Sequence, residues 1–363
     1  MMPAPRLNMW PPLPFELYAR RPSKRLPFPL EEPDCRTFSL ARHGLFTGIK
    51  ALGLEPGDEI LVPAYHHGSE IEALVRAGIV CRFYEVGQNL EPDENELEAL
   101  LDTPVQALFL IHYLGLPQNA VRWRTWCDEH GLLLIEDAAQ AWLSSSGGAP
   151  VGSYGDLSIF CLYKTFGLPD GAAMISSRPP QTPHSRRCLG LARLAREHGL
   201  YLAQRWGWLA ALHRRLRRTR EYDARRDFAL GDPGSTPCVV TQLLLARATD
   251  PTAPAIRAAN YAYLLERLDR FVPRIFPSLP EGASPFAFPI QSDRKEELLH
   301  RVAGRGIAAV DFWSTPHPCL PVEGFPRAAA LRESIIALPV HQELGVRELE
   351  RIVDTVLSNP RST

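Results

Sequence analysis

The stretch Leu132-Leu133-Leu134-Ile135-Glu136-Asp137-Ala138-Ala139-Gln140 determines how the rest of this sequence is interpreted. Its apolar run predicts a buried parallel strand, because strands covered on both faces read as continuous hydrophobic runs. The run leads to an acid, Asp137, and an amine, Lys164, lies on a later connection. An acid and an amine placed in this way can bind the ring nitrogen and the aldehyde of pyridoxal phosphate at the same time. The pair therefore predicts a site for this cofactor.

Each member of the pair has a simpler interpretation when it is taken alone. An acid at a strand end more often caps the next helix, and a lysine is more often solvated surface. A lysine that attacks an aldehyde needs a free amine, which burial or a nearby cation supplies. Lys164 has apolar residues on both sides, so its sequence context favours burial. The combination, rather than either residue, supports the cofactor site.

Short apolar runs alternate with helical stretches through the first half of the chain. The runs that predict strands are Glu59–Pro63, Val80–Val86, Ala107–His112, Leu132–Ile135 and Leu157–Leu162. This alternation is typical of an α/β fold with a mostly parallel central sheet. Farther on, the sequence predicts a smaller C-terminal α+β domain with a helix over Ile256–Leu268, a strand over Phe286–Ile290 and a final helix near 346–357.

The 363 residues exceed what one hydrophobic core usually serves, so we expect more than one structural unit. The division that the composition suggests is a Pro-rich N-terminal segment over 1–34, a large cofactor-binding domain over 35–183, an Arg- and Trp-rich helical insertion over 184–235 and a small C-terminal domain over 236–363.

The composition also narrows the class of protein. Lys and Arg number 40 against 41 Asp and Glu, which gives no reason to expect nucleic acid as a partner. The seven cysteines form no CxxC pair, as expected for reduced thiols in the cytosol, and no signal peptide is recognisable. We therefore expect a cytoplasmic protein. Hydrolase and metal-site motifs of the GxSxG, HExxH and EF-hand types are missing from the sequence, and we expect no metal.

Several polar residues follow directly on predicted strands. In an open α/β sheet, ligands bind beyond the carboxyl ends of the strands, so His66, His67 and His112 could share a crevice with Asp137. The segment Ala41-Arg42-His43-Gly44 precedes a predicted helix over Leu45–Leu52. A helix N-terminus can bind phosphate through its unpaired N–H groups, although a plain helix start fits this signal equally well.

The ordered motifs resemble the DegT/DnrJ/StrS family of pyridoxal phosphate-dependent aminotransferases, whose best-known members aminate keto-sugar nucleotides on the fold-type I scaffold. The matching residues lie between about 38 and 177. They are Ala51 to Ile60, Val62 to Tyr65, His130 to Ala141, Val151 to Asp156, Lys164 and Asp170-Gly171, and Leu338 to His341 resembles the family's ending.

The resemblance implies a role for each matching residue. Lys164 would be the catalytic lysine that binds the cofactor's aldehyde, and Asp137 the partner of its ring nitrogen. Gln140 would contact the phenolic oxygen, and His67 falls where the family stacks an aromatic ring. The positions of the family's phosphate-binding residues are taken by Arg42, His43 and, nearby, Cys161.

The resemblance further implies a homodimer that takes an amino group from an amino acid, glutamate or glutamine, and delivers it to a keto group, expected to be that of a sugar nucleotide. Candidate substrate-binding residues are His66, His112, Trp313 and His317, with Arg332 as a further guess. Two alternatives stay open at this point. One is a cofactor-dependent enzyme acting on a non-sugar substrate by transamination, elimination or substitution, and the other is an inactive scaffold, against which the retention of both Asp137 and Lys164 speaks.

The segment 186–220 is rich in arginine and carries leucines and tryptophans at helical spacing. This pattern predicts an amphipathic helix pair. Such a pair is commonly a solvated helical face packed on the enzyme. The other interpretations are a docking face for an anionic substrate or carrier and a contact with a membrane surface.

Overall fold

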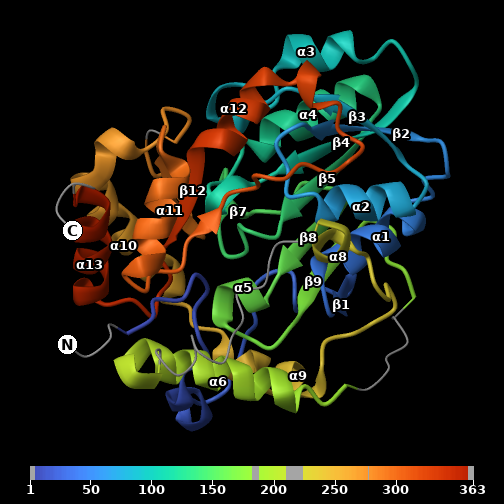
Figure 1. Ribbon diagram of the computed structural model, residues 1–363. Coiled ribbons are helices and arrows are strands. Elements are labelled where there is room, and N and C mark those ends of the chain that lie inside the picture. The colour runs from blue at the N-terminus through green and yellow to red at the C-terminus, as the bar shows by residue number, and fades with distance from the viewer. Residues whose placement is uncertain (1–4, 182–187, 210–223, 277, 359–363) are drawn as a thin grey trace.

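The computed structural model describes residues 5–181, 188–209, 224–276 and 278–358 and is built around a seven-stranded sheet (Figure 1). The order across the sheet is β1 (Cys35–Phe38), β9 (Ala172–Ser176), β8 (Leu157–Cys161), β5 (Leu133–Ala138), β4 (Val105–Ile111), β2 (Glu59–Pro63) and β3 (Val80–Tyr84). The strands from β8 to β3 run parallel, and β9 is antiparallel to both of its neighbours. The prediction of an α/β fold with a mostly parallel sheet is confirmed.

Strand β5 continues beyond its apolar run. Its ladder with β4 and β8 includes Asp137, which pairs with Ile111 on one side and Ile159 on the other. Asp137 therefore lies within the paired part of β5. The predicted end of the strand at Ile135 had implied that Asp137 follows the strand. A side chain anchored on paired backbone has little freedom to move, which suits a residue that must hold a ligand.

Helices cover both faces of this sheet, because successive strand side chains point to opposite sides. On one face α1 (Ala41–Ala51) and α2 (Ser69–Arg76) pack on Ile60 and Val62 of β2. On the other face α3 (Glu94–Ala99) and α4 (Ala120–His130) pack on Leu61. Gly48 lets α1 approach the sheet closely, since a Cβ there would lie 2.4 Å from a Leu157 methyl group.

The C-terminal part forms its own layer of sheet and helices, drawn in orange and red in Figure 1. Its three strands lie in the order β10, β12, β11 and are antiparallel. They pack with α10, α11 and α13 around a separate hydrophobic cluster. The elements are α10 (Ala253–Leu268), β10 (Ala287–Gln291), α11 (Lys295–Gly304), β11 (Val310–Asp311), α12 (Pro326–Ser334), β12 (Ile335–Pro339) and α13 (Val346–Leu357). The predicted C-terminal α+β unit is thus present.

The N-terminal segment packs across both units. Leu7 pairs with Ile307 of the C-terminal part, while Leu13 and Leu17 pack with Phe166 and with α9 (Val239–Ala248). Apart from the short turn η1 (Phe15–Ala19), residues 5–34 contain no helix.

The smaller elements complete the described part of the chain. They are α5 (Tyr163–Phe166), α8 (Ala224–Phe228), the two-stranded pair β6 (Ser145–Ser146) and β7 (Ala149–Pro150), and the 3-10 turns η2 (Gln88–Leu90), η3 (Tyr113–Gly115), η4 (Asp269–Phe271) and η5 (Val322–Gly324). No helix among the described residues combines the length and the apolarity needed to cross a membrane.

The Arg-rich segment contains α6 (Leu191–Arg205), and residues 207–209 after it are also helical. Its Arg193 pairs with Asp170, and Arg205 pairs with Glu16 of the N-terminal segment. The second helix of the predicted pair falls largely on 210–223, which lie outside the described residues.

Candidate active site

A cavity of about 340 Å³ opens beyond the carboxyl ends of the strands, where the large sheet meets the C-terminal part. Its size is within the usual range for a small-molecule site. The predicted residues that line it are Lys164, Asp137, Gln140, Arg42, His67, Cys161 and Trp313. The structure therefore brings together most of the residues that the sequence assigned to the cofactor.

Lys164 lies on α5, a single helical turn between β8 and β9. Its Nζ atom is 5.7 Å from the centroid of the Phe286 ring, which closes the cavity from the C-terminal part. The sequence holds four lysines. Lys24 and Lys50 are exposed, Lys295 pairs with Asp311, and Lys164 alone of the four lines the cavity.

Asp137 carries a buried carboxylate into the same cavity. One oxygen accepts a hydrogen bond from the Ala139 N–H at 2.8 Å. Burial and the negative charge of Glu70 raise the pKa of Asp137 to about 7, and the Lys164 charge opposes them. Within the described residues, no cation lies at ion-pair distance from this carboxylate. A protonated ring nitrogen is the kind of partner that such a carboxylate lacks, so the residues fit the pyridoxal phosphate ring.

Gln140 and His67 fit the two remaining contacts of the ring. The Gln140 Oε1 atom accepts from the Leu114 N–H at 2.7 Å, so the side-chain N–H groups are what it can offer the cavity. Burial lowers the pKa of His67 to about 4, which keeps its ring neutral. Phe228 and Trp313 lie edge-on to this ring, with centroids 5.8 and 6.4 Å away. A neutral aromatic ring that is flanked by other aromatic rings is suited to stacking on a cofactor.

The phosphate end differs from the sequence prediction in one respect. Helix α1 begins at Ala41 rather than Leu45, so Arg42 and His43 lie in its first turn. The residue before it, Leu40, has no side chain that can cap the helix, and Leu40, Ala41 and Arg42 line the cavity. First-turn N–H groups left without a cap suit a phosphate.

The side chains of Arg42 and His43 point to different places. Arg42 donates to the carbonyls of Asp227 and Ala229 at 2.9 and 2.8 Å, which fastens the α8 segment to the cavity rim. The His43 ring instead bonds the Leu230 carbonyl at 2.6 Å and lines a neighbouring cavity. The His43 N–H donates to the Leu40 carbonyl at 3.1 Å, and His43 is not among the residues that line the site of Lys164 and Asp137.

Three of the candidate substrate residues support the walls rather than line the cavity. His66 is fully buried against the Pro63 carbonyl at 3.0 Å, and burial lowers its pKa to about 3. His112 lies 2.9 Å from Glu136, and His317 lies 3.0 Å from Glu72. The fourth candidate, Trp313, lines the cavity.

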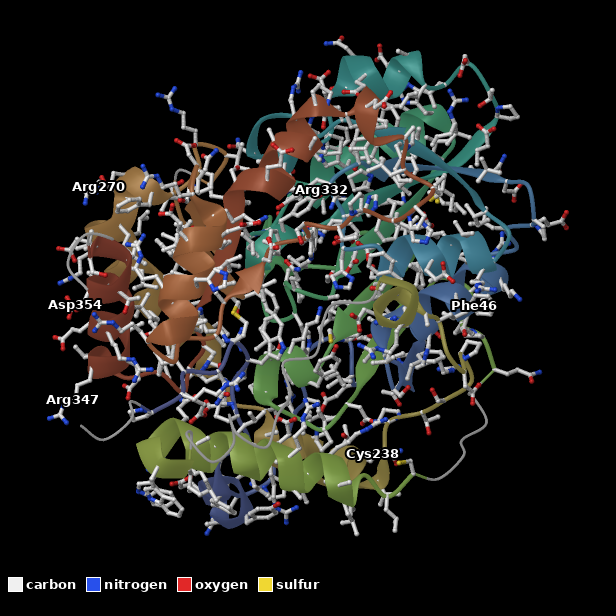
Figure 2. All side chains as sticks on the ribbon, viewed as in Figure 1. Phe46, Cys238, Arg270, Arg332, Arg347 and Asp354 are labelled. Atoms are coloured by element: carbon white, nitrogen blue, oxygen red, sulfur yellow. The ribbon has the colours of Figure 1, made fainter. Side chains whose placement is uncertain are left out.

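Arg332, labelled in Figure 2, comes from α12 and also supports the wall of the cavity. It donates to the carbonyls of Ala64 and His66 at 2.7 and 3.1 Å. These bonds tie the segment after β2, which carries His67, to the C-terminal part.

Sequence reasoning missed several lining residues, among them Trp10, Glu70, Asp227 and Phe286. Trp10, Asp227 and Phe286 come from distant segments, and no local pattern identifies them. Glu70 could have been found, since an acid in the first turn of a helix that follows a strand end lies on the ligand side of the sheet.

A lysine and an acid facing one cavity at the carboxyl edge of this sheet define the class: the fold is that of the pyridoxal phosphate-dependent aminotransferases of fold type I. The model of the DegT/DnrJ/EryC1/StrS aminotransferase family matches residues 30–204. This part of the chain is a DegT/DnrJ/EryC1/StrS aminotransferase domain, which confirms the resemblance read from the sequence, and the family depends on pyridoxal phosphate.

Relatives of known name agree with this assignment. GDP-perosamine synthase of Vibrio cholerae is 31% identical over 151 residues, which cover 41% of this chain and 41% of that protein. The chain thus spans about two fifths of that relative's length. The UDP-N-acetyl-3-dehydro-alpha-D-glucosamine 3-aminotransferase of Acidithiobacillus ferrooxidans is 26% identical over 332 residues, or 86% of this chain and 80% of that protein.

One solved structure shows the likeness of fold. Helicobacter pylori PseC, an aminotransferase involved in the biosynthesis of pseudoaminic acid, superposes with a TM-score of 0.67 at 17% identity. The superposition covers 97% of this chain and 98% of PseC, so the fold extends well beyond the matched domain.

Proposed function

We propose that this chain is a pyridoxal phosphate-dependent aminotransferase that moves an amino group from an amino acid to the keto group of a sugar nucleotide. The observation that carries the proposal is the convergence of Lys164 and Asp137 on one cavity. The names of the relatives, a GDP-perosamine synthase and a UDP-sugar 3-aminotransferase, support the acceptor class.

The roles of the residues follow from their chemistry. Pyridoxal phosphate, when bound, supplies an electron sink for the bonds at the donor's α-carbon. Asp137 holds a proton on the ring nitrogen, and Gln140 donates to the phenolic oxygen. The first turn of α1 binds the phosphate. Lys164 anchors the aldehyde and then moves a proton at the substrate carbon as general base and acid.

The donor half of the proposal has a direct test. Purified protein loaded with pyridoxal phosphate is mixed with glutamate, or with glutamine, and the cofactor is analysed by mass spectrometry. We expect its conversion to the aminated form, with release of the corresponding keto acid. A cofactor that stays in its aldehyde form with both donors, and with other amino acids, would contradict transamination.

The acceptor half needs a panel of keto-sugar nucleotides, with simple ketones as the comparison. We expect amination, seen as a mass change in the product, for at least one sugar nucleotide and a kcat/KM above that for the free ketones. Amination of the simple ketones alone would favour the non-sugar alternative.

The homodimer and the cytoplasmic location stay predictions from the resemblance and the composition. Sedimentation equilibrium on the cofactor-loaded protein tests the first, with a mass of twice the 40.6 kDa chain expected. The contact between 186–220 and an anionic surface also stays a prediction. Sedimentation with anionic vesicles at low salt tests it, and no binding would end the membrane interpretation.

A further inference from the structure

Arg257 is a fully buried cation on the inner face of α10, with 2% of its surface exposed. It donates three hydrogen bonds, to the side-chain oxygen of Gln342 at 2.8 Å and to the carbonyls of Thr165 and Pro285 at 2.7 and 3.3 Å. Within the described residues, no carboxylate lies at ion-pair distance from it. Its partners are therefore three neutral oxygens.

Two of these acceptors adjoin Lys164. Thr165 is the next residue along α5, and Pro285 precedes Phe286, whose ring faces the Lys164 amine. Gln342 adds a second donor to the Thr165 carbonyl, from its Nε2 atom at 3.0 Å. Since the Arg257 Nε can only donate, the Gln342 oxygen must face it, which leaves the amide N–H for Thr165. The Thr165 carbonyl thus accepts two bonds from the C-terminal part.

The turn that carries Lys164 needs such external support. Helix α5 has four residues, and a helix of this length has too few internal hydrogen bonds to persist by itself. Its position depends on what holds it from outside. Gly167, at its end, lies so close to the N-terminal segment that a Cβ would be 2.3 Å from the Pro11 carbonyl.

Burying an arginine without an acid is costly, and an apolar side chain of similar volume would fill the same space at lower cost. Burial lowers the pKa of Arg257 to about 10, so the guanidinium still keeps its charge at neutral pH. Only a planar fork of donors reaches Thr165, Pro285 and Gln342 at once. The geometry of these hydrogen bonds, rather than the filling of space, therefore explains why an arginine occupies this position.

We propose that Arg257 is a positioning residue that, with Gln342, fixes the turn carrying Lys164 and the Phe286 ring opposite its amine. The inference rests on the proposed function for the role of Lys164. It makes the C-terminal part a direct determinant of where the catalytic amine lies.

The test compares Arg257→Met and Arg257→Lys with Asn260→Ala as the matched control. Asn260 lies one turn farther along the same buried face and donates to the carbonyls of Val340 and His341, but it does not contact Thr165. Gln342→Ala, at a less buried position, removes one donor to Thr165 and serves if Arg257→Met does not fold.

Two readouts are measured on each variant at a temperature where it is folded. In Arg257→Met and Gln342→Ala we expect faster amide hydrogen exchange over residues 163–168 in the cofactor-free protein. In the loaded enzyme we expect kcat to fall by about tenfold or more while KM for the amino donor changes little, because a small displacement of a catalytic group acts on the chemical step. Arg257→Lys keeps the charge without the fork and should recover only part of kcat.

Asn260→Ala should lower the melting temperature but change neither the amide exchange over 163–168 nor kcat. Wild-type exchange over 163–168 in both test variants, or equal loss of kcat in Asn260→Ala, would overturn the proposal. The exchange measurement needs no activity, so it still decides the matter if the proposed aminotransferase reaction fails.

Discussion

Asp137 and Glu70 line the same cavity, and the charge of Glu70 adds to burial in raising the pKa of Asp137 to about 7. Burial opposes the ionisation of Glu70, yet its pKa is lowered, and the His67 N–H donates to this carboxylate at 2.8 Å. Two carboxyl groups in one cavity make the Asp137 carboxylate a strong acceptor for a proton on a bound ring. The same arrangement gives the cofactor-free protein a specific pH dependence.

Asp137→Asn should make the cofactor-free protein more stable than the wild type at pH 8. The folded protein holds the Asp137 proton more tightly than the unfolded chain, so its contribution to stability is complete below about pH 4 and is lost as the pH rises through about 7. Asparagine avoids this loss and can still accept from the Ala139 N–H. Melting temperatures between pH 4 and 8 should show a difference that grows with pH and then levels off. A difference that does not vary with pH would contradict the raised pKa.

Glu70→Gln should move that pH dependence downward. Removing the Glu70 charge takes away one cause of the raised pKa of Asp137 and leaves burial in place. The pH at which half of the Asp137 contribution is lost should therefore fall toward, but not reach, the ordinary range. It is measured as the Asp137→Asn difference in the Glu70→Gln background. An unchanged midpoint would mean that burial alone sets the pKa.

Glu136→Gln should lower the free energy of unfolding by about 2 kcal/mol or more. The NH2 group of glutamine would replace one carboxylate oxygen and would then face buried N–H donors that have lost their acceptor. The Glu136 carboxylate is completely buried and accepts from the ring of His112 and from the N–H groups of Gly152, Tyr154 and Gly155. Glu129 is exposed on α4, and Glu129→Gln should change stability by less than about 0.5 kcal/mol. Urea unfolding measures both variants. Equal midpoints for the two would refute the structural role of Glu136.

Arg42→Ala should weaken binding of pyridoxal phosphate by about tenfold, because the segment that lines the cavity loses both of its charged hydrogen bonds to Arg42 and must be ordered again when the cofactor binds. Arg42 fastens the α8 segment, and with it Asp227, to the rim of the cavity. Fluorescence titration of the cofactor-free protein gives the dissociation constant. Arg294→Ala, at an exposed position far along the chain, provides the control and should bind as the wild type does. Wild-type affinity in Arg42→Ala would show that the segment stays in place without it.

The parts of the fold that follow from local sequence were predicted well. Strand β5 and the strand β8 before Lys164 are continuous apolar runs, and such runs are recognisable without tertiary information. β1 was missed because Cys35–Phe38 shows no apolar run, and its pairing with β9 is decided by the sheet. The start of α1 was placed late because Leu40 lacks the side chain that normally marks a helix N-terminus.

The candidate site divides in the same way. Asp137, Lys164 and Gln140 belong to contiguous motifs, so the sequence was enough to place them together. The direction in which a side chain points was not predictable. The ring of His43, for example, is oriented by its hydrogen bond to the Leu230 carbonyl, which belongs to a distant segment of the chain. Trp10 and Asp227 reach the cavity through tertiary approach alone.

The most direct test of the site is covalent labelling of the lysine. The protein is loaded with pyridoxal phosphate, reduced with borohydride, digested and analysed by mass spectrometry, which is simple because the chain holds only Lys24, Lys50, Lys164 and Lys295. We predict that the cofactor's mass is found on Lys164 and that Lys164→Ala abolishes it. A label on another lysine, or none on a protein shown to bind the cofactor, would contradict the assignment of Lys164.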